Sequence, residues 1–370
     1  MVLWSLMIKP KLKTKSPNFS SGPTKKPDSW SLNGLDKSLL GRYHRSKYIS
    51  DYVDEILLDL KNILNIPSNY KVLLSPGSCS GAIQSVIWSL LGKRRITSII
   101  YDFWGEKWSN EIKKLKYKQE IRSSLNGNMP ILNEICPSND IFFVWTGTST
   151  GMSIDNISWI PNNQTGIVVS DITSSVFMNR IEWEKLDAAV FSWQKAIGSE
   201  SQHGIIVLSP KALDRLKENK KKLVPNIIDL NNREKIINTP SLLCFSDFRF
   251  CLSWYKNKGG LNWANKKCKD NRLVLDKWVE SNDYLENFAK EKKYRALSTS
   301  YFLFKNKVRK KEIEKVFSFL EYENIAYDIR SYRKAPLGIR IWTGPTILKK
   351  DLNTLTNWLD WCFYKYILKK

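Results

Sequence analysis

Two short apolar stretches of the chain end in side chains that could do chemistry. Residues 166–169 lead into Ser170 and Asp171, and residues 188–191 lead into a Ser-Trp-Gln-Lys sequence that ends at Lys195. In an open α/β sheet, ligands bind beyond the carboxyl ends of the strands, where such a carboxylate and amine would meet. Pyridoxal phosphate needs both groups, because an amine forms a Schiff base with its aldehyde and a carboxylate pairs with its pyridine nitrogen. Either residue alone would more simply be a charged residue at the start of a loop.

A glycine-rich turn upstream could hold the phosphate of such a cofactor. Residues 77–81 read Gly-Ser-Cys-Ser-Gly and join an apolar stretch to a helical one. Small residues let backbone N–H groups approach an anion, and the dipole of the following helix adds to the attraction. An ordinary tight turn explains the same pattern equally well. Trp104 also follows a predicted strand end, where its indole could stack on the pyridine ring, although tryptophans in such places are more often core residues.

The elements that must position these residues alternate between strands and helices. This alternation favours an α/β fold with a mostly parallel sheet that is covered on both faces. The pattern predicts strands over 71–74, 98–101, 141–145, 166–169, 188–191 and 204–208, and helices over 49–60, 82–91, 106–115 and from Ser209-Pro210 onward.

The length of 370 residues suits two domains of unequal size. We expect an N-terminal arm over 1–20, a large domain over 21–245 and a smaller C-terminal α/β domain over 246–370, with a polar connection near 231–239. In the smaller domain the pattern predicts helices near 264–290, over 308–322 and from Asp351, and strands over 298–304 and 338–342.

Composition narrows the functional class. The net charge is +23, from 59 Lys and Arg against 36 Asp and Glu, but the lysines form scattered short runs rather than one stripe. Nucleic-acid binding therefore stays only as an alternative from another functional class. The six cysteines include no C-x-x-C pair and there are only two histidines, so we expect no metal site and a reducing cytoplasm. No apolar run approaches the roughly 18 residues that a membrane helix needs, so we expect no membrane partner.

Six segments together carry a resemblance to a known family. In chain order they are Pro17-Asn18-Phe19-Ser20-Ser21-Gly22-Pro23, Gly41-Arg42-Tyr43-His44-Arg45-Ser46-Lys47, Gly147-Thr148-Ser149-Thr150-Gly151, Phe191-Ser192-Trp193-Gln194-Lys195, Ile237-Asn238-Thr239-Pro240-Ser241 and Gly338-Ile339-Arg340-Ile341-Trp342. From about residue 9 to 365 the chain resembles the phosphoserine aminotransferases, in the class-V branch of the fold type I pyridoxal-phosphate enzymes. Trp193 and the Arg-Ile-Trp sequence are similar to the variant found in alphaproteobacteria and some archaea. The resemblance implies a large domain with a mostly parallel seven-stranded sheet and a smaller C-terminal domain.

The resemblance also implies a role for each matching cofactor residue. Lys195 would be the Schiff-base lysine and Asp171 the partner of the pyridine nitrogen, while Trp104 would stack on the ring and Thr148 would lie near its 3′-oxygen. The residues implied around the phosphate are Ser78, Cys79, Ser80 and Gln194, joined by Asn238 and Thr239 from the neighbouring subunit. A homodimer with shared active sites follows from that arrangement.

Substrate residues are implied in the same way. Arg340 resembles the arginine that binds the substrate α-carboxylate in a bidentate contact, and an arginine inside an apolar strand needs an anion in any case. His44 and Arg45 of the partner subunit would contact the substrate phosphate, with Arg333 as a helper. Two departures stand out. Many family members have a His-Arg pair where this chain has Tyr332 to Pro336, and many have Ala-Arg where it has Cys79-Ser80.

The implied reaction transfers the amino group of L-glutamate to 3-phosphohydroxypyruvate and gives O-phospho-L-serine, the second step of serine synthesis. The phosphorylated hydroxythreonine precursor of vitamin B6 is a further possible acceptor. Related enzymes of the same fold remain alternatives, including alanine–glyoxylate aminotransferases and cysteine desulfurases. A desulfurase needs a cysteine on a mobile loop, whereas Cys268 falls in a predicted helix. His203 is expected to be structural.

Overall fold

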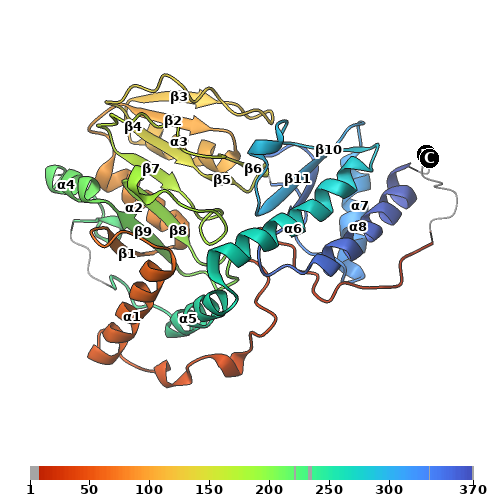
Figure 1. Ribbon diagram of the computed structural model, residues 1–370, viewed down its shortest axis with the longest axis horizontal. Helices are drawn as coiled ribbons and strands as arrows, with labels where there is room; N and C mark the ends of the chain where they lie inside the picture. The colour runs from red at the N-terminus through yellow and green to blue at the C-terminus, as the bar shows by residue number, and fades with distance from the viewer. Residues whose placement is uncertain (1–7, 221, 232–235, 333, 369–370) are drawn as a thin grey trace.

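The computed structural model describes residues 8–220, 222–231, 236–332 and 334–368, and these form a large sheet, a smaller sheet and a two-stranded hairpin (Figure 1). The larger sheet has seven strands in the order β1-β9-β8-β7-β4-β2-β3. β9 runs antiparallel to both of its neighbours, and the remaining pairs are parallel. The strands are β1 (Lys71–Pro76), β2 (Ile96–Ile100), β3 (Gln119–Ser123), β4 (Asp140–Val144), β7 (Val168–Asp171), β8 (Ala188–Ser192) and β9 (His203–Leu208). The predicted α/β class with a mostly parallel sheet is confirmed.

Helices cover both faces of this sheet because its central strands are apolar on both sides. In β8, for example, Val190 packs into one hydrophobic cluster with α2, α3 and α4, whereas Phe191 packs into the cluster on the opposite face. The helices of the large sheet are α1 (Lys47–Ile63), α2 (Ser78–Leu90), α3 (Phe103–Lys114), α4 (Pro210–Glu218) and α5 (Leu242–Asn257). The side chains of Ser46 and Ser209 cap α1 and α4, each by accepting an N–H from the first turn.

The smaller sheet has the antiparallel order β10-β11-β12 and is packed against the C-terminal helices. Its strands are β10 (Leu285–Asn287), β11 (Thr299–Phe304) and β12 (Gly338–Trp342), and its helices are α6 (Gly260–Glu280), α7 (Lys310–Tyr322) and α8 (Lys349–Phe363), followed by a π-helical turn at Tyr364–Leu368. A two-stranded hairpin of β5 (Thr146–Gly147) and β6 (Met152–Ser153) lies beside the large sheet, and short 3-10 turns occupy Leu32–Gly34, Lys37–Leu39, Trp183–Lys185, Asn226–Ile228 and Lys292–Tyr294.

Three assignments differ from the sequence-based expectation. No element was expected where α5 forms, and the expected domain boundary at 245/246 falls inside that helix. The helix expected near 264–290 ends at Glu280, and β10 follows it. β3 was not predicted, because it is a polar edge strand with partly exposed side chains and therefore lacks the apolar run of a central strand.

The N-terminal segment connects the two sheets. Its first described residues lie along the small domain, where Trp358 Nε1 donates to the carbonyl of Leu12 at 2.8 Å and Trp342 N donates to the carbonyl of Phe19 at 3.1 Å. The chain then crosses to α1, as the red trace in Figure 1 shows. On the way it passes Lys195, because Thr24 N donates to the carbonyl of Gln194 at 3.1 Å. The N-terminal segment therefore borders the predicted site together with the sheets.

Candidate active site

A cavity of about 170 Å³ lies at the carboxyl ends of β4, β7 and β8. Eight of the residues singled out from the sequence line it, namely Ser78, Cys79, Ser80, Trp104, Thr148, Asp171, Gln194 and Lys195. They come from the ends of β7 and β8, two helices and the β5–β6 hairpin, so only the folded sheet brings them together.

Lys195 follows β8 and reaches into this cavity. Its Nζ donates to the carbonyl of Ser21 at 2.5 Å and lies 5.9 Å from the centre of the Trp342 ring. Desolvation and, after it, the positive charge of Arg340 lower the pKa of Lys195 to about 8, although Asp171 acts in the opposite direction. A much larger fraction of the amine is therefore neutral near pH 7–8 than for an ordinary lysine, which makes it a nucleophile.

Asp171 ends β7, and donors from two other places hold its buried carboxylate. Oδ1 accepts the backbone N–H of Thr173 at 3.0 Å, and Oδ2 accepts Trp108 Nε1 at 3.3 Å. Neither Trp108 nor Thr173 was predicted from the sequence. Trp108 is one helical turn after Trp104, so helical spacing could have placed it on the same side of α3. Thr173 is two residues beyond Asp171, the offset at which aspartate side chains commonly accept a backbone N–H.

The glycine-rich turn at the start of α2 is built to approach an anion closely. Gly77 and Ser78 have φ values of 76° and 53°, and a Cβ on Gly81 would lie only 1.8 Å from the carbonyl oxygen of Pro76. The backbone N–H groups of Ser78 and Gly81 donate to the carbonyls of Gln202 and Gly77. The N–H groups of Cys79 and Ser80, in the first turn of the helix, are left to bind an anion. Among the described residues, the buried Oε1 of Gln194 has no hydrogen-bond partner. These residues fit the phosphate of pyridoxal phosphate.

Trp104 of α3 and Thr148 of the β5–β6 turn also line the cavity. The Trp104 ring packs against Tyr332 at 5.4 Å between centroids, and Lys107 Nζ lies 5.0 Å from its centre. Thr148 is buried in the β5–β6 turn. That turn is held at Ser149, whose hydroxyl donates to Asp102 at 2.7 Å.

Arg340 belongs to β12 of the smaller sheet and brings a positive charge to the cavity from that side. Burial lowers its pKa, and its Nε has no hydrogen-bond partner among the described residues. The positive charge of Arg340 lowers the pKa of Lys195, so the guanidinium and the lysine amine belong to one electrostatic environment. An incoming carboxylate would give Arg340 the partner that it lacks.

Besides Arg340, which acts on the cavity through its charge, four described residues of the predicted site do not line the cavity of their own chain: His44, Arg45, Asn238 and Thr239. His44 is buried with Nε2 unpaired among the described residues, and Arg45 is exposed. Asn238 Nδ2 donates to the carbonyl of Thr239 at 3.2 Å, while the buried Oδ1 of Asn238 has no partner in the described part of the chain. Arg333 lies outside the described residues. His203 is buried and stacks on Phe245 at 4.9 Å, and burial lowers its pKa to about 4.

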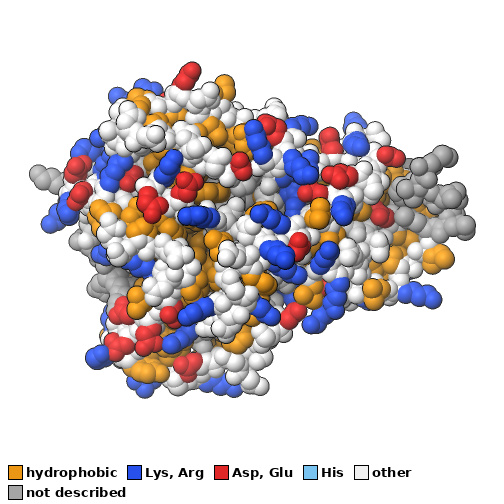
Figure 2. Space-filling view, viewed as in Figure 1, with side chains coloured by type: hydrophobic (Ala, Val, Ile, Leu, Met, Phe, Trp, Pro, Cys, Tyr) orange, Lys and Arg blue, Asp and Glu red, His pale blue; other side chains and the backbone are white. Residues whose placement is uncertain are grey.

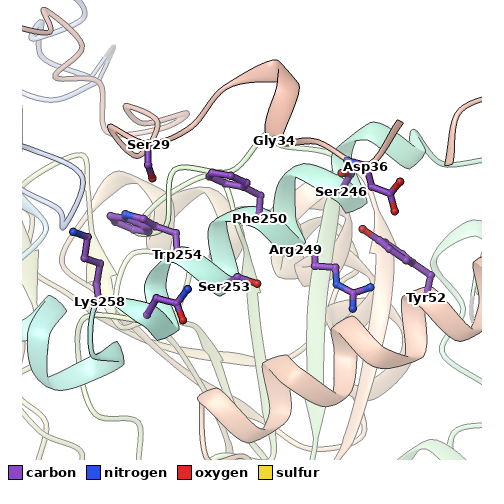
Figure 3. A pocket seen from close by; sticks show the side chains of 11 residues that line it. Ser29, Gly34, Asp36, Tyr52, Ser246, Arg249, Phe250, Ser253, Trp254 and Lys258 are labelled. Carbon is purple, nitrogen blue, oxygen red and sulfur yellow. Dashed lines mark hydrogen bonds between the residues drawn. The ribbon is translucent and has the colours of Figure 1, made fainter. Parts of the chain in front are cut away.

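Other surface features match the predicted chemistry less well. A larger cavity of about 590 Å³ lies between the N-terminal segment, α1 and α5 (Figure 3), but Arg249 in its wall is already paired with Glu55 at 3.0 Å. Lys and Arg side chains are spread among acidic ones on the face in Figure 2. Within the described ranges, no cluster of three His, Cys, Asp or Glu residues could hold a metal ion, and no helix is long and apolar enough to span a membrane.

Comparisons with known proteins agree with this geometry. No family model matches the chain. A phosphoserine aminotransferase of Methanosarcina mazei is 36% identical over 368 residues, covering 96% of this chain and 99% of the relative, and that of Methanosarcina barkeri is 35% identical over the same shares. Among solved structures, a phosphoserine aminotransferase of Cytophaga hutchinsonii superposes with a TM-score of 0.81 at 18% identity, covering 92% of this chain and 97% of the other, which shows the shared fold. The chain therefore belongs to the phosphoserine aminotransferase family of pyridoxal-phosphate-dependent enzymes.

Proposed function

We propose that the chain transfers the amino group of L-glutamate to 3-phosphohydroxypyruvate, giving O-phospho-L-serine and 2-oxoglutarate. One observation carries the proposal: a single cavity joins Lys195, Asp171 and the anion-binding turn of α2, with Arg340 acting on it from the small domain. When bound, pyridoxal phosphate supplies a ring that withdraws electrons from the substrate α-carbon. A second acceptor, the phosphorylated hydroxythreonine, would use the same groups.

Each residue then has a defined task. Lys195 would hold the cofactor at its aldehyde, and its neutral amine would move the proton at the substrate α-carbon. Asp171 would pair with the pyridine nitrogen, Trp104 would pack on the ring, and Thr148 would hold the 3′-oxygen. Ser78, Cys79, Ser80 and Gln194 would hold the phosphate.

The substrate ends are bound by cations. Arg340 takes the α-carboxylate common to glutamate and phosphoserine, because planar guanidinium groups match carboxylates in two parallel hydrogen bonds. His44 and Arg45 take the far end, which is a phosphate in one substrate and a carboxylate in the other. Arg333 stays a possible helper at that end.

We further propose a homodimer in which each active site is completed by the partner subunit. His44, Arg45, Asn238 and Thr239 do not line their own cavity, so a second copy would have to deliver them. Large exposed apolar side chains lie on the same segments: Leu32, Leu40, Tyr43, Tyr48 and Leu243. Exposed apolar groups of this kind mark protein interfaces. Of the expected division into an arm over 1–20, a large domain over 21–245 and a small domain over 246–370, we keep the three parts but place the last boundary after α5, because Phe245 and Phe248 of that helix pack on Trp193 of the large domain. We also propose action in the reducing cytoplasm, where the six free cysteines would persist.

Lys195 should capture the cofactor with a pH dependence set by its lowered pKa. Adding pyridoxal phosphate to the cofactor-free protein should produce a visible absorbance band at a rate that rises with pH around a midpoint near 8, not near the ordinary 10.5, because only the neutral amine attacks. Arg340→Met should move this midpoint upward, since a nearby positive charge is removed, and Lys195→Ala should give no such band. A midpoint of 10 or above, or a downward shift in Arg340→Met, would contradict the assignment.

Steady-state kinetics test the substrates themselves. Arg340→Met should lower kcat/KM about 10²- to 10³-fold for glutamate and for O-phospho-L-serine alike, because two charge-assisted hydrogen bonds to the shared α-carboxylate are lost. Arg309→Met is the matched control, since this small-domain arginine is exposed and bonds only Glu312 within the described contacts. Wild-type protein that shows no exchange between these two amino acids and their keto acids would sink the proposed function.

Hybrid dimers test the shared site. Protomers carrying Lys195→Ala and protomers carrying His44→Ala with Arg45→Ala are each expected to be nearly inactive. Mixing them should restore about a quarter of wild-type activity, because half of the randomly formed dimers then hold one intact site. If both sets of residues served the site of their own chain, mixing would restore nothing.

A further inference from the structure

Cys79 belongs to both parts of the predicted cofactor site, the anion-binding turn of α2 and the surroundings of the Asp171 carboxylate. It is the second residue of α2, so its backbone belongs to the anion-binding turn, and its side chain lines the cavity next to Asp171. Many members of the family have alanine here by the resemblance described above, and alanine has no side-chain donor.

The thiol of Cys79 accepts a hydrogen bond and keeps its own proton available for another. Thr173 Oγ1 donates to Cys79 Sγ at 2.9 Å, so the sulfur acts as the acceptor of this hydrogen bond and its own proton is free to be donated elsewhere. The same Thr173 donates its backbone N–H to Asp171 Oδ1 at 3.0 Å. Thr173 therefore bonds both the thiol and the carboxylate, and the carboxylate is the one member of this buried group that only accepts.

The thiol keeps its proton in this place. Burial, and after it the neighbouring charge of Asp171, raises the pKa of the Cys79 thiol well above its ordinary value. A thiol that stays protonated is a donor and a poor nucleophile, so Cys79 differs from the reactive cysteine of a desulfurase.

We propose that Cys79 is a positioning residue for Asp171: its S–H donates to the carboxylate, and through the Thr173 hydroxyl it holds that carboxylate in register with the anion-binding turn. This inference rests on the proposed function, because Asp171 is the group that meets the ring nitrogen of the cofactor. With Trp108 Nε1 and Thr173 N, the thiol completes a set of three donors around the carboxylate.

Two probes distinguish this role from a simple effect on the phosphate. We would titrate the cofactor-free protein with pyridoxal phosphate and with pyridoxal, which lacks the phosphate, and follow the visible band. Cys79→Ala should weaken both probes by the same factor, about 2- to 10-fold, as expected for one lost hydrogen bond to a charged acceptor. Cys79→Ser keeps a donor and should return both affinities to within about twofold of wild type. A loss confined to the phosphorylated probe, or no loss at all, would overturn the proposal.

Two further comparisons keep the test decisive. Cys268→Ala removes another buried thiol, from α6, and should leave both affinities unchanged, so that packing loss alone is excluded. If Cys79→Ala does not fold, Thr173→Val should weaken both probes and Thr173→Ser should not. In the folded double variant, Cys79→Ala with Thr173→Val should lose little more than Cys79→Ala alone, because the two groups act in one chain. Additive losses would contradict that chain, whereas wild-type protein that binds neither probe would refute the proposed function instead.

Discussion

The site depends on keeping the amine of Lys195 and the carboxylate of Asp171 in one small cavity without an ion pair between them. Lys195 and Asp171 would form an ordinary ion pair in water. In this fold, desolvation and the charge of Arg340 favour the neutral lysine, whereas Trp108 and Thr173 occupy the carboxylate oxygens with neutral donors. The amine is thus left free to react and the carboxylate is left free to pair with a ring nitrogen.

The rest of the structure serves this separation of charge. The central strands of the large sheet are buried on both faces, so the side chains that could do chemistry, such as Asp171, lie at the strand ends. The N-terminal segment supplies a neutral acceptor, the carbonyl of Ser21, at the lysine amine. Gly22 is required beside it, since a Cβ there would lie 2.9 Å from Lys195 Cε. The small domain then delivers Arg340 on β12, whose positive charge adds to desolvation in lowering the pKa of Lys195.

Much of this arrangement was predictable because it follows from local pattern. Asp171 and Lys195 end apolar stretches, and the small residues of 77–81 start a helix, so their meeting at the strand ends needed only the rule for open α/β sheets. Trp108 and Thr173 were missed because their role depends on distances across the cavity. The antiparallel direction of β9 was also beyond the sequence pattern, since an apolar strand reads the same in either direction. His44, Arg45, Asn238 and Thr239 were indicated only by resemblance, and a single chain leaves their contacts to the proposed partner. Arg333 lies outside the described residues, so its prediction stays open.

The most direct test of the account is the visible absorbance spectrum of the purified wild-type protein before and after amino acids are added. The account predicts a yellow protein whose band bleaches with O-phospho-L-serine and with glutamate, and is left unchanged by serine, alanine and cysteine at the same concentration. This pattern would establish both the cofactor and the need for a second acidic group on the substrate. A band that bleaches with alanine or cysteine but is unchanged by O-phospho-L-serine would contradict the proposed substrate. A protein that stays colourless with added pyridoxal phosphate would contradict the central role of Lys195.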